Sequence, residues 1–320
     1  MRLSIDMASV VLWWIPRLNL LVLILVVSAC QANNHSTLSD PDERISVVTT
    51  NSIIADWVRF IGGQRVDVFS VLPVGSDPHT FRPGARDVTH IVNADLIITV
   101  GLGLETHWVE RLLESASVDL SEIIVLGEFV NPINFTNDID EHFDSRLDPH
   151  FWLDPLRVQM AVSVIAAQLS VEDSTYQGVY EANSNSYKTE LSELHLWATE
   201  RVNEIDPSRK VLITSHDSLG YFAERYGFEI AGTVIKNYGT ETRPTAIELA
   251  GLKEIVMNHN GTAIFGETTV SSRFSEILAQ ETGASLFKLY SGSLGPSGGE
   301  SDTYSKMFRT NVDIIVDALR

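Results

Sequence analysis

The chain has 320 residues, of which 44% are hydrophobic, and its formal net charge is −19. This length accommodates two domains of ordinary size, and the hydrophobic fraction is that of a globular protein. The negative charge argues against nucleic acid as a partner, because phosphate backbones are bound by Lys and Arg side chains. It would instead raise the local concentration of cations around the protein.

The start of the chain has the pattern of an export signal. A hydrophobic run at 18–29 follows Arg17 and ends in small residues directly before Cys30. This pattern predicts a signal peptide over residues 1–29. Small residues before a cysteine favour a bacterial lipoprotein, in which Cys30 becomes the lipid-modified N-terminus. A plain signal peptide or a membrane anchor is the alternative, although the run is short for a full membrane span.

Cys30 is the only cysteine in the chain. We therefore expect no internal disulfide and no cysteine-based zinc site. The residues that follow are polar and include Asn, Ser, Asp and Pro. This composition predicts a flexible tether at 30–44 between the lipid and the folded part.

Short hydrophobic runs alternate with helical patterns from Ile45 onward. This alternation predicts βαβ units and a mostly parallel sheet. Strands are predicted at 45–50, 66–72, 96–100 and 123–126, and helices at 52–61, 86–93, 105–115 and 156–169.

A long amphipathic segment at 176–205 then interrupts the alternation. Its apolar residues recur at spacings of three, four and seven, and no turn signal divides it, so one helix of about 45 Å is favoured over two shorter ones. No Pro or Gly lies between Glu181 and Asp206, which predicts a helix without a hinge. The apolar residues are Tyr180, Tyr187, Leu191, Leu194 and Ala198.

The α/β alternation resumes after this helix. We therefore predict an α/β fold of two lobes with mostly parallel sheets, at 45–171 and 208–320, joined by a single long rigid helix at 172–207. The second lobe has predicted strands at 210–214, 229–235, 263–265 and 285–289, and helices at 218–226, 245–258, 272–282 and 303–319.

Four candidate metal ligands stand in distinctive loops along the chain. They are His79, His150, His216 and Asp302, and neighbouring members are between 66 and 86 residues apart. No single helix or hairpin could unite them, so a common site requires two lobes that meet around it.

Three of these four candidates follow the end of a predicted strand. Ligands of open parallel sheets bind at the carboxyl ends of the strands, so this placement favours a site between the lobes. His79 follows strand 66–72, His216 follows 210–214 and Asp302 follows 285–289, whereas His150 follows a long irregular loop.

Imidazole and carboxylate ligands suit Zn²⁺, Mn²⁺ and neighbouring metals. Four protein ligands complete a tetrahedron, an arrangement that holds an ion rather than activating a water molecule. Glu267 and Asp217 are candidates to orient the histidine rings, as are Asp77 and Asp148. Three histidine ligands also predict that acid weakens binding, because protons compete for imidazole.

The remaining histidines are interpreted as surface residues, because a lone histidine is more often a surface residue than a metal ligand. His142 lies in an acidic loop shortly before His150, where a solvated loop and weak cation capture are the two interpretations. The surface residues are His35, His90, His107, His195 and His259.

Several phrases of the sequence, taken in order, resemble the metal-binding solute receptors of bacterial zinc and manganese ABC importers, the cluster A-I family. The resemblance covers about residues 45–320. It implies two α/β lobes bridged by one long helix, with a metal between them held by His79, His150, His216 and Asp302. The matching phrases are VGSDPHTF at 74–81, DPHFWLDP at 148–155, SHDSLGYF at 215–222, FGET at 265–268, DTY at 302–304 and NVD at 311–313.

The third ligand position bears on the choice of metal. Manganese members of this family usually carry Glu there, so His216 favours zinc, with a manganese-specific receptor as the alternative. Zinc members often have a long histidine-rich loop before the second ligand. The corresponding loop here is short and acidic and contains only His142.

The resemblance implies an exported, monomeric receptor at the outer face of the cell membrane or in the periplasm, anchored by lipid at Cys30. It would pass Zn²⁺, or alternatively Mn²⁺, to a membrane permease of an ABC importer and would not be an enzyme. One alternative is a zinc-dependent hydrolase with Asp302 as base, but the chain has no His-Glu-x-x-His pair. Another is a receptor for a chelated metal or small organic ligand.

Overall fold

The computed structural model describes residues 44–135, 147–235, 240, 242–259 and 263–320. The predicted signal peptide, the lipidation site Cys30 and the predicted tether up to residue 43 lie outside the described residues, as does His142. Within the described part of the chain, no helix combines the length and the apolar character needed to cross a membrane.

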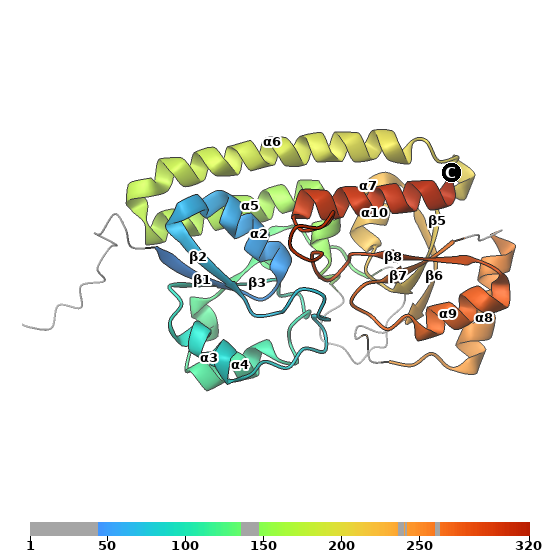
Figure 1. Cartoon of the computed structure of the whole chain (residues 1–320), viewed down its shortest axis with the longest axis horizontal. Coiled ribbons are helices and arrows are strands. Elements are labelled where there is room, and N and C mark those ends of the chain that lie inside the picture. The colour runs from blue at the N-terminus through green and yellow to red at the C-terminus, as the bar shows by residue number, and fades with distance from the viewer. Residues whose placement is uncertain (1–43, 136–146, 236–239, 241, 260–262) are drawn as a thin grey trace, which may run out of the picture. The chain divides into compact units, whose positions relative to one another are not determined.

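The first lobe is built on a four-stranded sheet with strand order β2-β1-β3-β4. All of its strand pairs are parallel, as the sequence pattern predicts. Its strands are β1 Ile45–Thr49, β2 Val66–Ser70, β3 Leu96–Thr99 and β4 Ile124–Val125, and its helices are α2 Ser52–Gly62, α3 Ala85–Val92, α4 Val109–Ala116 and α5 Pro155–Glu172 (Figure 1).

The second lobe repeats this topology with strand order β6-β5-β7-β8, again with parallel pairs. The strand–helix alternation that recurs in the sequence therefore corresponds to a second sheet of the same topology. Its strands are β5 Val211–His216, β6 Glu229–Ile235, β7 Ala263–Glu267 and β8 Ser285–Leu289, and its helices are α7 Gly220–Tyr226, α8 Ala246–Asn258, α9 Arg273–Thr282 and α10 Tyr304–Leu319.

Short 3₁₀ helices connect several of these elements. They are η3 Gly63–Arg65, η4 Leu120–Glu122, η5 Leu126–Phe129, η6 Phe151–Leu153, η7 Ser174–Tyr176 and η8 Pro207–Arg209.

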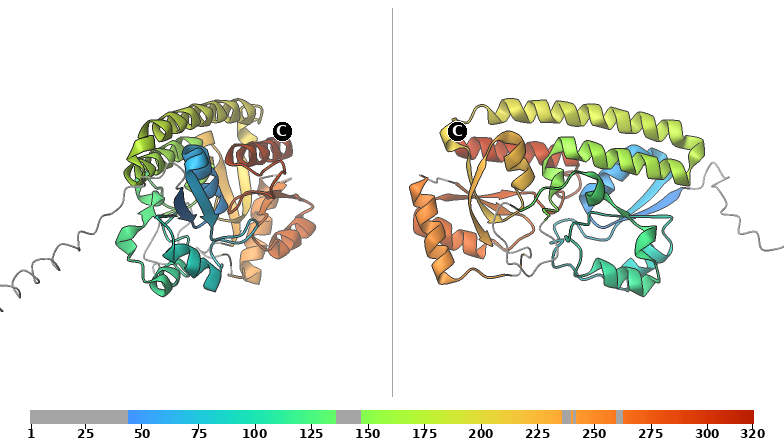
Figure 2. Two further views of the ribbon diagram at one scale, coloured as in Figure 1. Left: turned by 60° about the vertical axis from the view of Figure 1, so that its left-hand side comes forward. Right: turned by 180° about the vertical axis from the view of Figure 1, so that it is seen from behind.

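The long helix predicted from the sequence is α6, an unbroken helix of 26 residues at Gln177–Val202. It contacts α2 of the first lobe and α10 of the second, and it extends along both lobes (Figures 1 and 2). Its buried face includes the five apolar residues on which the prediction rested. The two-lobed α/β fold with one long connecting helix is thus confirmed, while the residue boundaries of the lobes stay a prediction.

Helix α4 begins at Val109, four residues later than predicted. Gly101, Leu102 and Gly103 all have positive φ, which breaks helical geometry there. Glu105 is buried, and its carboxylate accepts hydrogen bonds from the Thr50 hydroxyl at 2.6 Å and from two backbone N–H groups after β3. This segment is therefore a turn that ties α4 to the ends of β1 and β3.

Aromatic side chains fill the contact between the lobes. The rings of Trp57 on α2 and Tyr304 on α10 meet edge to face, with centroids 5.5 Å apart. The Tyr304 hydroxyl also donates to the backbone carbonyl of Trp152 at 2.7 Å. All three side chains are fully buried. Edge-to-face aromatic pairs add about 1 kcal/mol to the free energy of burial, so this contact helps to hold the two lobes together.

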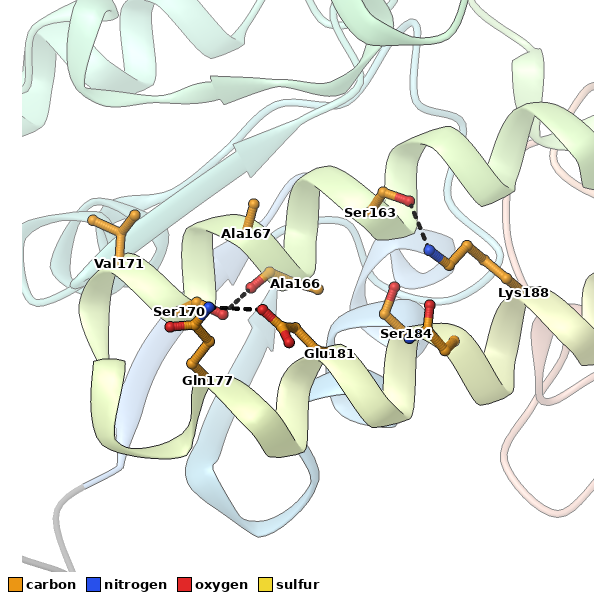
Figure 3. A pocket seen from close by; sticks show the side chains of 10 residues that line it. Ser163, Ala166, Ala167, Ser170, Val171, Gln177, Glu181, Ser184 and Lys188 are labelled. Atoms are coloured by element: carbon orange, nitrogen blue, oxygen red, sulfur yellow. Dashed lines mark hydrogen bonds between the residues drawn. The ribbon is translucent and has the colours of Figure 1, made fainter.

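A surface hollow lies between α5 and α6 (Figure 3). Small side chains line much of it, which reflects the close approach of the two helices. Polar links cross or border it: the Lys188 ammonium donates to the Ser163 hydroxyl at 3.4 Å, and Gln177 donates to Glu181 at 2.7 Å. The candidate metal ligands do not line this hollow.

Candidate metal centre

Three of the four predicted ligands gather at one point of the molecule. One nitrogen each of His79, His150 and His216 lies within 4.8 Å of the corresponding nitrogens of the other two. The side chains are nearly inaccessible, with exposed fractions of 4%, 1% and 3%. His79 follows β2 and His150 precedes η6 in the first lobe, whereas His216 ends β5 in the second. The two lobes thus contribute ligands to one buried cluster.

The ring of His150 is oriented by Asp148. Its Nδ1 lies 2.7 Å from Asp148 Oδ1, which also accepts the His150 backbone N–H at 2.9 Å. This contact leaves Nε2 as the nitrogen available to a metal. Burial, followed by the charge of His216, lowers the pKa of His150 to about 3. The ring is therefore neutral at physiological pH, as a metal ligand must be.

Asp148 is in turn fixed by the second lobe. The Tyr221 hydroxyl donates to its backbone carbonyl at 2.6 Å. A Cβ at Gly220 would lie only 2.6 Å from Asp148 Oδ2, so this glycine allows the carboxylate to approach the start of α7. Burial raises the pKa of Asp148 to about 8.

We expect Gly220→Ala to weaken Zn²⁺ binding by roughly 10- to 100-fold, the range found when an orienting partner of a metal ligand is perturbed. The added methyl group displaces Asp148 and thereby loosens His150. Competition titration against a chelator measures the effect. Gly251→Ala is the control, because nothing lies within 4 Å of a Cβ there. Equal affinities of the two variants would contradict the role given to Gly220.

The ring of His216 is oriented by Glu267, at the end of β7. His216 Nδ1 contacts Glu267 Oε1, and three serine hydroxyls donate to the same carboxylate. His216 Nε2 is buried and has no hydrogen-bond partner among the described residues, so it is the nitrogen available to a metal. The donating hydroxyls are those of Ser215 at 3.3 Å, Ser218 at 3.0 Å and Ser291.

The contact between Glu267 and His216 shifts the pKa values of these two groups in opposite directions. Burial alone would raise the pKa of Glu267, but the charge and hydrogen bond of His216 and the Ser291 hydroxyl lower it to about 2. Burial would likewise lower the pKa of His216, yet the charge and hydrogen bond of Glu267 raise it above its ordinary value. Glu267 is thus a buried anion that faces a basic imidazole.

The loop that carries His79 is held from both sides. The Asp77 carboxylate accepts the His79 backbone N–H at 2.9 Å through Oδ1 and the Thr240 hydroxyl of the second lobe through Oδ2. Trp108 Nε1 donates to the Pro78 carbonyl at 2.8 Å. Burial, with the charges of His216 and His150, lowers the pKa of His79 well below its ordinary value.

Asp302, the fourth predicted ligand, does not join this group in the structure. Its Oδ2 accepts the Gly298 backbone N–H at 2.9 Å, and its Oδ1 accepts the Lys306 ammonium at 2.8 Å. These contacts lower the pKa of Asp302. The carboxylate thus closes the loop before α10, and the structure does not bring it together with the three histidines. Its role as a ligand stays a prediction.

Two of the residues predicted to orient the histidine rings, Glu267 and Asp217, differ in their contacts. Glu267 contacts His216 as described, whereas Asp217 is buried next to His216 and its charge raises the pKa of that ring. The sequence interpretation missed Tyr221, Gly220, Trp108 and Ser291. Tyr221 and Gly220 stand in the SHDSLGYF phrase, which was therefore an available signal for them.

Comparison with known proteins places this site in a family. Residues 47–318 match the family described as "Zinc-uptake complex component A periplasmic". The chain belongs to this family. The matched range includes all three clustered histidines as well as Asp302.

Proteins similar to this chain are named for different metals. A manganese-binding lipoprotein, MntA of Halalkalibacterium halodurans, is 32% identical over 94% of this chain and 96% of its own length. The Mn-bound periplasmic metal binding protein of Candidatus Liberibacter asiaticus superposes with a TM-score of 0.75 at 27% identity, covering 87% of this chain and 100% of that one. The periplasmic zinc binding protein TroA of Treponema pallidum superposes with a TM-score of 0.76 at 27% identity, covering 86% and 99%.

Proposed function

We propose that this protein is an extracytoplasmic receptor that captures Zn²⁺ and delivers it to the membrane permease of an ABC importer. The observation that carries the proposal is the buried cluster of three imidazoles contributed by both lobes. Neutral imidazole suits Zn²⁺ better than it suits Mn²⁺, which prefers oxygen ligands. The ion is the cargo of the protein, and no chemistry is done on it.

The electrostatic surroundings support a cation as the ligand. Glu267 is a buried anion beside His216, and the pKa values of His79 and His150 are lowered, so both rings are neutral. A cation bound by three neutral rings would be partly balanced by this carboxylate. The net charge of −19 would also concentrate cations near the protein.

Lipid anchoring at Cys30 and a monomeric state complete the proposal. The first rests on the small residues before Cys30 and on relatives that are named as lipoproteins. A monomer agrees with a site to which one chain supplies all three histidines.

A manganese receptor is the second candidate, and the names of several relatives favour it. A zinc-dependent hydrolase is less well supported, because the carboxylate assigned as its base, Asp302, is bound to Gly298 and Lys306. The family match also favours a transport receptor over an enzyme.

The test is a competition titration of metal-free protein with Zn²⁺ and Mn²⁺ in metal-buffered solution. We expect one ion per chain and Zn²⁺ affinity at least about 100-fold above that for Mn²⁺, in keeping with the Irving–Williams order for nitrogen ligands. Tighter binding of Mn²⁺ would favour the manganese receptor. The absence of stoichiometric binding of either ion would reject both.

A further inference from the structure

We propose that the fourth ligand of the captured metal is a solvent oxygen rather than a side chain of this protein. The inference rests on the proposed receptor function and deepens it. A tetrahedral Zn²⁺ needs four donors, and the described part of the chain brings three together. The hydrogen bonds of the neighbouring polar groups indicate where the fourth ligand comes from.

The carboxylates that border the cluster already have other roles. Asp148 binds Nδ1 of His150, and Glu267 binds Nδ1 of His216 together with three serine hydroxyls. Asp77 accepts the Thr240 hydroxyl and the backbone N–H of His79. Each carboxylate therefore orients a ligand or its loop. The second oxygen of Asp148, Oδ2, has no hydrogen-bond partner among the described residues and lies against Gly220 at the start of α7.

One segment of the second lobe, Ser291–Ser293, touches the surroundings of all three histidines. Ser291 donates to Glu267, which holds His216, and its carbonyl accepts Trp152 Nε1 at 2.6 Å, two residues after His150. A Cβ at Gly292 would lie 3.0 Å from Cδ of Pro78, the residue before His79. This segment is the natural place for a fourth ligand from the second lobe.

The side chains of Ser291–Ser293 do not supply this fourth ligand. The Ser291 hydroxyl is directed to Glu267, and Ser293 Oγ accepts the Gly75 backbone N–H at 2.9 Å. Between them stands Gly292, which is buried and has no side chain. The segment thus brings backbone, and no unengaged donor side chain, to the surroundings of the three imidazoles.

A polar group lies close to Gly292. The Thr269 hydroxyl lies 3.1 Å from the position that a Cβ of Gly292 would take. This oxygen is buried and has no hydrogen-bond partner within the described residues. Buried polar groups of this kind are commonly satisfied by an ordered water molecule. Because the three histidines are almost fully buried, the donor that enters with the metal must be as small as water.

A coordinated water has a functional consequence for delivery. An incoming donor can replace the water before any histidine dissociates, so the metal can be passed on by ligand exchange. The three orienting contacts to His79, His150 and His216 then need not break at the first step.

The test uses Co²⁺, which has the same charge as Zn²⁺ and can be studied by electron paramagnetic resonance. Equilibrium dialysis first establishes that one Co²⁺ binds per chain. Electron–nuclear double resonance is then recorded in H₂O and D₂O. We expect strongly coupled proton signals that disappear in D₂O, because a coordinated water places its protons closer to the metal than any imidazole N–H.

Two variants address the side-chain alternatives, His142→Ala for the segment outside the described residues and Asp302→Asn for the loop before α10. We expect both to retain the exchangeable proton signal and to bind Co²⁺ within about threefold of the unmodified protein. Stoichiometric binding without the signal would overturn the inference, as would a tenfold loss of affinity in either variant. Failure to bind Co²⁺, Zn²⁺ and Mn²⁺ at all would instead reject the proposed function.

Discussion

Replacing His216 by Ala is expected to lower Zn²⁺ affinity by about 100- to 1,000-fold. Four-ligand zinc sites have apparent binding free energies of about 10–16 kcal/mol, so one ligand contributes roughly 3–4 kcal/mol. His216 is also the only clustered histidine from the second lobe, so its loss removes that lobe from the metal. Competition with a chelator of known affinity measures the change.

The control for this variant is His259→Ala. His259 is exposed, and its Nδ1 lies 3.0 Å from the carbonyl oxygen of Ile255 in the preceding helix, α8. It should bind Zn²⁺ as tightly as the unmodified chain. Both variants should retain the helical circular dichroism of the parent. A His216→Ala protein that is folded and binds Zn²⁺ within threefold of the parent would refute the site.

The fold could be predicted because its local signals agree with its topology. Hydrophobic strands alternate with amphipathic helices in both lobes, and the spacing of apolar residues on α6 matches the face that it buries. The start of α4 could not be predicted in the same way. A helical pattern begins at Glu105, but the buried carboxylate is held by Thr50, a residue 55 positions away. Tertiary contacts of this kind override local propensity.

The three histidines could be predicted because strand ends converge in a parallel sheet. Asp302 is harder to interpret, because an aspartate just before a helix has two possible roles. Here the carboxylate pairs with Lys306, one helical turn later, and with a backbone N–H of its own loop. In the segment around Gly292 the two serine hydroxyls are engaged in other hydrogen bonds, and the glycine has no side chain, so the segment leaves no ligand signal in the sequence.

Zn²⁺ affinity is expected to fall about tenfold per pH unit below the pKa of His216, and not by the factor of a thousand that three competing protons would cause. The pKa of His150 is lowered to about 3 and that of His79 is lowered well below its ordinary value, so protons compete far less for these two rings than for His216. Only the pKa of His216 is raised. Above that pKa all three rings are neutral, so proton competition at His216 should no longer lower the affinity.

The variant Glu267→Gln distinguishes protonation of His216 from acid-induced unfolding of the protein as the cause of the lost affinity. Burial lowers the pKa of His216, and the charge and hydrogen bond of Glu267 oppose that shift. Without the carboxylate, the pKa of His216 falls, so the decline in affinity begins at a lower pH than in the parent. Affinity at high pH falls by roughly 10- to 100-fold, because a neutral amide is a weaker orienting acceptor for the ring than the carboxylate it replaces. Isothermal titration with Zn²⁺ between pH 5 and pH 8 measures both quantities. A slope near three protons in the parent, or an onset that does not move in the variant, would show that the Glu267–His216 pair does not set the pH response.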